Sequence, residues 1–78
     1  MEPAEWRKKA GLTLKQAAQR LDCSSASCVF RYERGEREAP NSVVLAYGRE
    51  SDGEVTGEDL NRVRKRFLRS EGKGRAAA

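Results

Sequence analysis

The sequence predicts an all-α fold, a compact bundle of about five short helices. Residues that begin or end helices divide the chain into short segments, and apolar residues recur within these segments at helical spacing. No run of alternating β-branched or aromatic residues is long enough to suggest a strand. With 78 residues the chain should form one small domain, which we expect at residues 1–70. Residues 71–78 have no apolar anchor, and we expect them to form a disordered tail.

The first two helices are marked by the residues at their ends. A proline in the first turn and Gly11 at the end predict a helix over residues 3–10. Thr13 and Gln16 have the spacing of a capping box, in which each side chain bonds the backbone N–H of the other residue. A second helix therefore begins there, and it should stop near Asp22. Its apolar face consists of Leu14, Ala17, Ala18 and Leu21.

A third helix should begin at a serine and end at Gly35. Either Ser24 or Ser25 can cap its first turn, because a serine hydroxyl accepts a hydrogen bond from a backbone N–H at that end. Val29 and Tyr32 lie three residues apart on one face, so we expect both in the core. The charged residues after Gly35, up to residue 40, are expected to form a loop.

Two further helices complete the bundle. The fourth covers residues 41–51, with core candidates Val44, Leu45 and Tyr47. Thr56 caps the last helix, whose first turn carries two acidic residues at the positive end of the helix dipole. The apolar stripe of this helix consists of Leu60, Val63 and Phe67. The stripe either closes the core of the monomer or lets Phe67 and Leu68 pair across the twofold axis of a dimer.

The charge of the chain indicates a polyanionic partner. Sixteen Lys and Arg residues against 12 Asp and Glu residues give a net charge of +4. The basic residues are concentrated near the end, where residues 60–78 hold seven basic side chains and one acidic side chain. A charged helix face is often only solvated, so charge alone does not establish nucleic-acid binding.

The composition argues against an enzyme. The chain has no His, which removes the Ser–His and Cys–His pairs that activate nucleophiles. Cys23 and Cys28 are too few for a metal site without further ligands, so we expect two reduced thiols, no metal and no cofactor. No segment is apolar enough to span a membrane, and the N-terminal residues lack the apolar stretch of a signal peptide. We expect a cytoplasmic protein without membrane contact.

The most informative feature is a set of short motifs in the first half of the chain. They are the pair Trp6 and Arg7, AGLT from Ala10 to Thr13, Ala18, Asp22, and RYERGER from Arg31 to Arg37. The segment from Trp6 to Leu60, about 55 of the 78 residues, resembles the helix-turn-helix regulators related to phage repressors and Cro proteins, the lambda-repressor-like domains. Leu14 replaces a frequent glutamine of this family. The interval between Leu21 and Glu33 is one residue longer than usual, which leaves the start of the third helix open.

The resemblance implies that the third helix, at about residues 24–34, enters the major groove of DNA. The candidates for reading bases are Ser25, Ala26, Ser27, Phe30 and Arg31. Arg31 is the preferred reader, because its guanidinium can grip O6 and N7 of guanine, although it could instead contact a phosphate or pair with a carboxylate. Phe30 either touches a thymine methyl group or packs against its own domain. The candidates for phosphate contact are Lys15, Gln16, Ser24, Arg34 and Arg37, whereas Glu33 should serve the structure.

These inferences predict a transcription regulator of bacterial or phage origin. It would bind double-stranded DNA as a homodimer on a palindromic operator, in the manner of a repressor or Cro protein, and would be found on the nucleoid in the cytoplasm. Phe67 and Leu68 are the candidate dimer contacts. The alternative is an antitoxin or another protein-interaction module that binds a protein partner through residues 60–70. A third option, binding of any duplex through the basic tail, would show no sequence preference.

Overall fold

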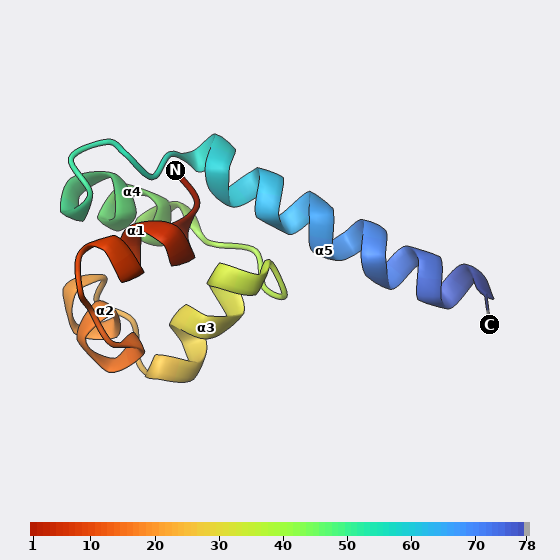
Figure 1. The fold of residues 1–78 in the computed structure, drawn as a ribbon, viewed down its shortest axis with the longest axis horizontal. Coiled ribbons are helices and arrows are strands. Elements are labelled where there is room, and N and C mark those ends of the chain that lie inside the picture. Colours follow the sequence, from red (N-terminus) through yellow and green to blue (C-terminus); the bar gives the residue numbers. More distant parts are fainter. Residues whose placement is uncertain (78) are drawn as a thin grey trace.

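The computed structural model describes the backbone of residues 1–77 and the side chains of residues 1–71. Within this range it contains helices only, which confirms the all-α fold. The helices are α1 (Pro3–Lys9), α2 (Leu14–Arg20), α3 (Ala26–Arg34), α4 (Asn41–Glu50) and α5 (Gly57–Ala77). Figure 1 shows α1 to α4 gathered into a bundle, while α5 leaves the bundle and points away from it. The described helices include none that is long and apolar enough to cross a membrane.

Helix α5 is longer than the short helices that the sequence predicts. Its 21 residues continue past Ser70, and the molecule measures 40 Å along its longest axis against 22 Å along the other two. Side chains beyond Glu71 and the whole of Ala78 lie outside the described residues. The disorder expected for residues 71–78 therefore stays a prediction.

The core lies between α1, α2, α3, α4 and the first half of α5. The rings of Trp6 and Tyr47 meet edge to face at its centre, with 5.9 Å between their centroids and an interplanar angle of 76°. Around them are further buried hydrophobic residues, namely Ala17, Ala18, Leu21, Val29, Tyr32, Val43, Ala46, Val55, Leu60 and Val63. Val29, Tyr32 and Tyr47 thus occupy the core as the sequence predicts. Leu60 and Val63 are also buried there, which is one of the two roles that the sequence left open for their stripe.

One core prediction in α4 is wrong. Leu45 is 64% exposed, and Val44 is only half-buried against the core, whereas Val43 and Ala46 are buried beside Tyr47. The reason is the helical repeat: residues four and one before Tyr47 share its face, while Leu45 lies on the other side of the helix.

The helix ends match the predicted caps. The N–H of Gln16 donates to Oγ1 of Thr13 at 3.1 Å, and the N–H of Thr13 donates to Oε1 of Gln16 at 2.9 Å, so the capping box of α2 is confirmed. At the start of α3 the N–H of Cys28 donates to Oγ of Ser25 at 3.3 Å. Ser25 is therefore the cap of α3, which decides between the two serines that the sequence left open. Thr56 caps α5 by accepting from the N–H of Asp59 at 3.1 Å.

The joint between α3 and α5 is a close approach of two backbones. Gly35 follows α3 in the left-handed conformation, with φ of 80°. A Cβ atom at this position would overlap the carbonyl oxygen of Val63, so only glycine allows α5 to lie so near. Arg64 secures the joint, because its Nη1 donates to the carbonyl oxygens of Gly35 at 2.9 Å and of Glu36 at 2.8 Å.

Candidate nucleic-acid interface

Helices α2 and α3 follow each other in the chain and are joined by a short turn (Figure 1). After the last turn of α2, Asp22 takes a left-handed conformation with φ of 55°, and the N–H of Cys23 donates to the carbonyl oxygen of Ala18 at 2.9 Å. This bond satisfies a carbonyl at the end of α2 and reverses the chain. The turn then leads to Ser25, which caps α3. Two short helices joined by such a turn form the unit that can present its second helix to a groove of DNA.

Helix α3 has one buried and one exposed face. Val29 and Tyr32 point into the core, with exposed fractions of 0% and 5%. The exposed face consists of Ser27, Phe30, Arg31 and Arg34. These positions are three, four and seven residues apart, so they share one side of the helix. A face of this kind is available to a partner over the whole length of α3.

An ion pair holds α3 against α1. Nε of Arg7 donates to one carboxylate oxygen of Glu33 at 2.6 Å, and Nη2 of Arg7 donates to the other at 3.2 Å. Nη1 of the same arginine donates to the carbonyl oxygen of Leu12 at 3.0 Å, so the loop before α2 is tied in as well. Both side chains are largely buried, at 16% and 6% exposed. Glu33 therefore serves the structure, as the sequence predicts, although its partner was not foreseen.

The predicted base-reading residues lie at different depths. Ser27 and Arg31 are exposed, Ser25 is exposed and caps the helix, and Ala26 is half-buried. Within residues 1–71 Arg31 has no carboxylate within ion-pair distance, and the nearby Glu33 is bound to Arg7. The intramolecular pair that the sequence left open for Arg31 is thus not found among the described side chains.

Phe30 and Arg34 contact each other, an arrangement that the sequence reasoning missed. The guanidinium carbon of Arg34 lies 5.4 Å from the centroid of the Phe30 ring and 5.9 Å from the centroid of the Phe67 ring. Nη1 of Arg34 is also 3.4 Å from a carboxylate oxygen of Glu36. The spacing of Phe30 and Arg34, one helical turn apart, was a local signal for the first contact. The ring of Phe67 comes from α5, and no local signal connects it with α3.

The remaining phosphate candidates are exposed and lie on either side of α3 in the sequence. Lys15 and Gln16 belong to the first turn of α2, Ser24 to the turn before α3, and Arg37 to the loop after it. The capping box engages the side-chain oxygen of Gln16 and leaves its NH₂ group for another acceptor. Among the described side chains, no hydrogen bond or ion pair joins these four residues to one another, so any shared role depends on a partner that spans them.

The two cysteines flank the start of α3. Both are half-buried free thiols packed against the core. Burial raises the pKa of the Cys23 thiol to about 11, and the neighbouring Cys28 thiol adds to this effect. Cys23 is therefore a protonated, packing side chain at neutral pH. In the described part of the chain, no three Cys, Asp or Glu side chains gather in a way that could hold a metal ion.

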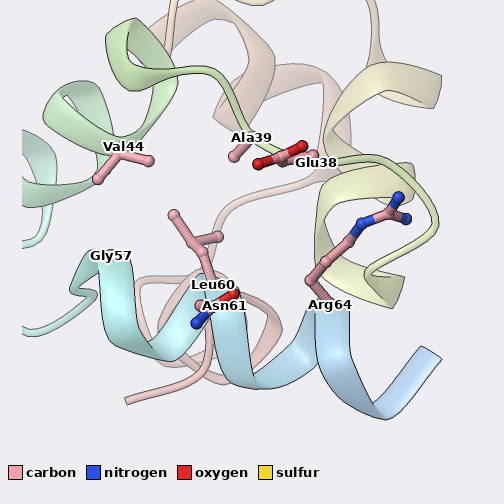
Figure 2. A pocket seen from close by; sticks show the side chains of 7 residues that line it. All are labelled: Glu38, Ala39, Val44, Gly57, Leu60, Asn61 and Arg64. Atoms are coloured by element: carbon pink, nitrogen blue, oxygen red, sulfur yellow. The ribbon is translucent and has the colours of Figure 1, made fainter. Parts of the chain in front are cut away.

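A small hollow lies away from α3, between the loop after Glu36, the start of α4 and α5. Figure 2 shows its lining, which is formed by Glu38, Ala39, Val44, Gly57, Leu60, Asn61 and Arg64. Its volume of about 130 Å³ is below the roughly 300 Å³ at which small-molecule sites begin. This hollow is therefore a weaker candidate for a functional surface than the exposed face of α3.

Comparison with known proteins identifies the same region. A family model described as a helix-turn-helix domain matches residues 4–49, which is more than half of the chain. The match begins in α1 and ends in α4, so it includes the turn between α2 and α3 and both partners of the Arg7–Glu33 pair. Neither the curated proteins nor the solved structures gave a significant match.

Proposed function

Because the chain belongs to the helix-turn-helix domain family, we propose that it is a transcription regulator that binds double-stranded DNA at specific sequences. In this proposal α3 lies in the major groove. The observation that carries the proposal is the exposed face of α3, with hydroxyl and guanidinium donors on a helix whose other side is buried and bound to α1. A helix held in this way can place donors against base edges with a fixed register.

Arg31 is the proposed base reader. It lies near the middle of the exposed face, and its guanidinium can donate two hydrogen bonds to O6 and N7 of a guanine, a pairing worth about 1–3 kcal/mol of discrimination. Ser25, Ala26 and Ser27 form the first turn, the part of such a helix that contacts bases. Ala26 is half-buried, so its methyl group can offer only part of its surface to DNA.

Phosphate contacts would fix the position of α3 on the duplex. Lys15, Ser24 and Arg37 are exposed around it, and each cation adds affinity that is sensitive to salt but not to sequence. Gln16 and the hydroxyl of Ser24 can donate to phosphate oxygens as neutral groups. Arg34 belongs to the same set, since its side chain is 51% exposed at the end of α3.

We further propose that two copies bind one palindromic operator, as Cro-like repressors do. Leu68, which lies in α5 and is 49% exposed, supports a dimer contact there. Phe67 is half-buried and lies against Arg34 of its own chain, so it is less available for a second copy than Leu68. We also propose that the protein is bacterial or phage-encoded and acts in the bacterial cytoplasm, because its proposed ligand, DNA, lies there.

Selection of bound sequences from a random duplex pool at moderate salt tests the function. A palindromic consensus is expected, and a pool without enrichment would contradict sequence-specific binding. Arg31→Ala should then relax the preference at one position of each half-site. The matched controls are Lys15→Ala and Arg37→Ala, which should lower affinity for all sequences and flatten the salt dependence. An unchanged consensus for Arg31→Ala would refute its role as base reader.

The alternative function is capture of a partner protein along α5. Its support is the exposure of Leu68 between the basic residues Lys65 and Arg69. Removal of the chain from Arg62 onward is too severe a test, because it deletes Val63 from the core. Leu68→Glu is the better variant, since it changes only the exposed part of α5. Selective loss of a protein partner, with monomer binding to a half-site intact, would favour this second function.

A further inference from the structure

Arg34 is the point at which α5 reaches the exposed face of α3. Its guanidinium carbon is close to the ring of Phe30 on the preceding turn of α3 and to the ring of Phe67 on α5, at 5.4 and 5.9 Å from the ring centroids. An exposed arginine normally samples many rotamers. Contacts with two rings from different helices restrict this sampling. The guanidinium side chain nevertheless stays 51% exposed, so it remains open to a partner.

The joint between α3 and α5 fixes the place of the Phe67 ring. Gly35 lies against the backbone of Val63, and Arg64 donates to the carbonyl oxygen of Gly35 at 2.9 Å. Phe67 follows Val63 by one helical turn and shares its face, so its ring is carried to the end of α3. The contact with Arg34 is thus a consequence of how the two helices are joined, and it does not depend on the freely exposed part of α5.

We propose that Phe67 is a positioning residue for DNA binding, whose ring orders the Arg34 guanidinium on the exposed face of α3 as a phosphate-binding group. The inference rests on the proposed function. An arginine beside an aromatic ring keeps N–H groups for hydrogen bonds, and ordering it before binding reduces the entropy lost on association. In the free protein one of these N–H groups faces the carboxylate of Glu36 at 3.4 Å. A phosphate replaces this carboxylate in the complex.

Two substitutions of Phe67 distinguish the effect of the aromatic ring from the effect of apolar side-chain volume. Phe67→Leu keeps an apolar side chain without a ring, whereas Phe67→Tyr keeps the ring. Affinity for a mixed-sequence duplex, measured from about 50 to about 200 mM salt, should fall about two- to fivefold for Phe67→Leu and stay unchanged for Phe67→Tyr. The charge of Arg34 is retained in both variants, so their salt slopes should equal that of the parent. Arg34→Ala should lower both the affinity and the slope, the latter by about one.

The control for an apolar change elsewhere is Leu45→Ala, which alters an exposed leucine of α4 and should leave DNA binding unchanged. Circular dichroism checks that every variant is folded at the assay temperature. Without DNA, the Nε–H resonance of Arg34 should be displaced by the aromatic rings. Phe67→Leu should move it toward the position of an ordinary arginine, while Phe67→Tyr should not.

The outcomes distinguish this inference from the proposed function. If the parent binds the duplex and Phe67→Leu binds it equally tightly, the positioning role is wrong while DNA binding stands. Equal losses for Phe67→Leu and Phe67→Tyr, or an Arg34→Ala variant with the parent's salt slope, would also overturn it. A parent protein that binds no duplex would refute the function itself, and the positioning role with it.

Discussion

Gly35 has two constraints that can be measured separately. Its φ of 80° disfavours any residue with a side chain, and a Cβ atom there would overlap the backbone of α5 at Val63. Gly11 has only the first constraint, since its φ is 71° but a Cβ atom there would have no neighbour within 4 Å. Gly48, within α4, has neither.

A series of alanine substitutions at these glycines should therefore give graded stabilities. Gly35→Ala should lower the free energy of unfolding by about 3 kcal/mol or more, because left-handed strain and backbone overlap add. Gly11→Ala should lower it by about 1 kcal/mol, and Gly48→Ala should raise it by about 0.5–1 kcal/mol through helix propensity. Urea unfolding measures all three. Equal losses at Gly35 and Gly11 would mean that the backbone of α5 at Val63 does not lie close against Gly35.

At the scale of elements, the Arg7–Glu33 pair sets the position of α3 against α1. Glu33→Gln keeps the shape of the side chain but leaves the guanidinium of Arg7 largely buried without its counter-charge. We expect a loss of about 3 kcal/mol in the free energy of unfolding. The control is Glu2→Gln, which removes the exposed pair with Arg66 at 2.8 Å and should cost less than about 1 kcal/mol. Similar losses for both variants in urea unfolding would contradict the role given to the buried pair.

The start of α5 predicts a pH dependence of stability. The carboxylate of Asp59 accepts hydrogen bonds from the backbone N–H of Thr56 at 2.9 Å and from the N-terminal ammonium of Met1 at 3.0 Å. The backbone bond from Thr56 is the main cause that lowers the pKa of Asp59 from 3.8 to about 2. Because the folded pKa lies below the unfolded one, this stabilisation is complete above about pH 4 and is lost as the pH falls toward 2.

Thermal unfolding between about pH 5 and pH 2 tests this expectation. The parent should lose about 1–2 kcal/mol of stability over this range from Asp59 alone. Asp59→Asn should be less stable than the parent at pH 5 and should have a flatter profile, so that the two proteins converge toward pH 2. Parallel profiles would show that Asp59 does not carry the effect.

The sequence predicts those features of the helices that depend on residues close together in the chain, such as caps and buried faces. The capping box at Thr13 is visible in the sequence because cap and partner are three residues apart, and the core face of α3 follows from the spacing of Val29 and Tyr32. Leu45 was placed in the core because apolar character alone does not give the rotation of α4.

Contacts between distant segments were not predictable in the same way. Arg7 with Glu33, and Arg34 with Phe67, depend on how α3 lies against α1 and α5, which no single segment specifies. The sequence therefore predicts which face of α3 forms the candidate interface. It does not predict that the guanidinium group of Arg34 is held in place by the Phe67 ring.

At the scale of the whole molecule, the first half of α5 packs in the core of the domain, while its second half extends away from the bundle (Figure 1). Leu60 and Val63 are buried in the bundle, although the family match ends at residue 49. One turn later Phe67 lies against Arg34 on α3, and the next residue, Leu68, is exposed. Successive turns of α5 therefore pack in the core, contact the candidate interface on α3 and face the solvent.

Three truncated chains that end at different residues of α5 should distinguish these roles. A chain ending at Arg62 loses Val63 and the Arg64 contacts, so it should be unfolded by circular dichroism at 25 °C, since loss of a buried core residue costs a large part of a marginal stability of about 5 kcal/mol. A chain ending at Arg66 keeps the core and should fold, but without Phe67 and the proposed dimer contact Leu68 it should bind duplex DNA more weakly. A chain ending at Ser70 should match the full chain in both respects. If the shortest chain folds and binds DNA like the longest, α5 has no part in either the core or the interface.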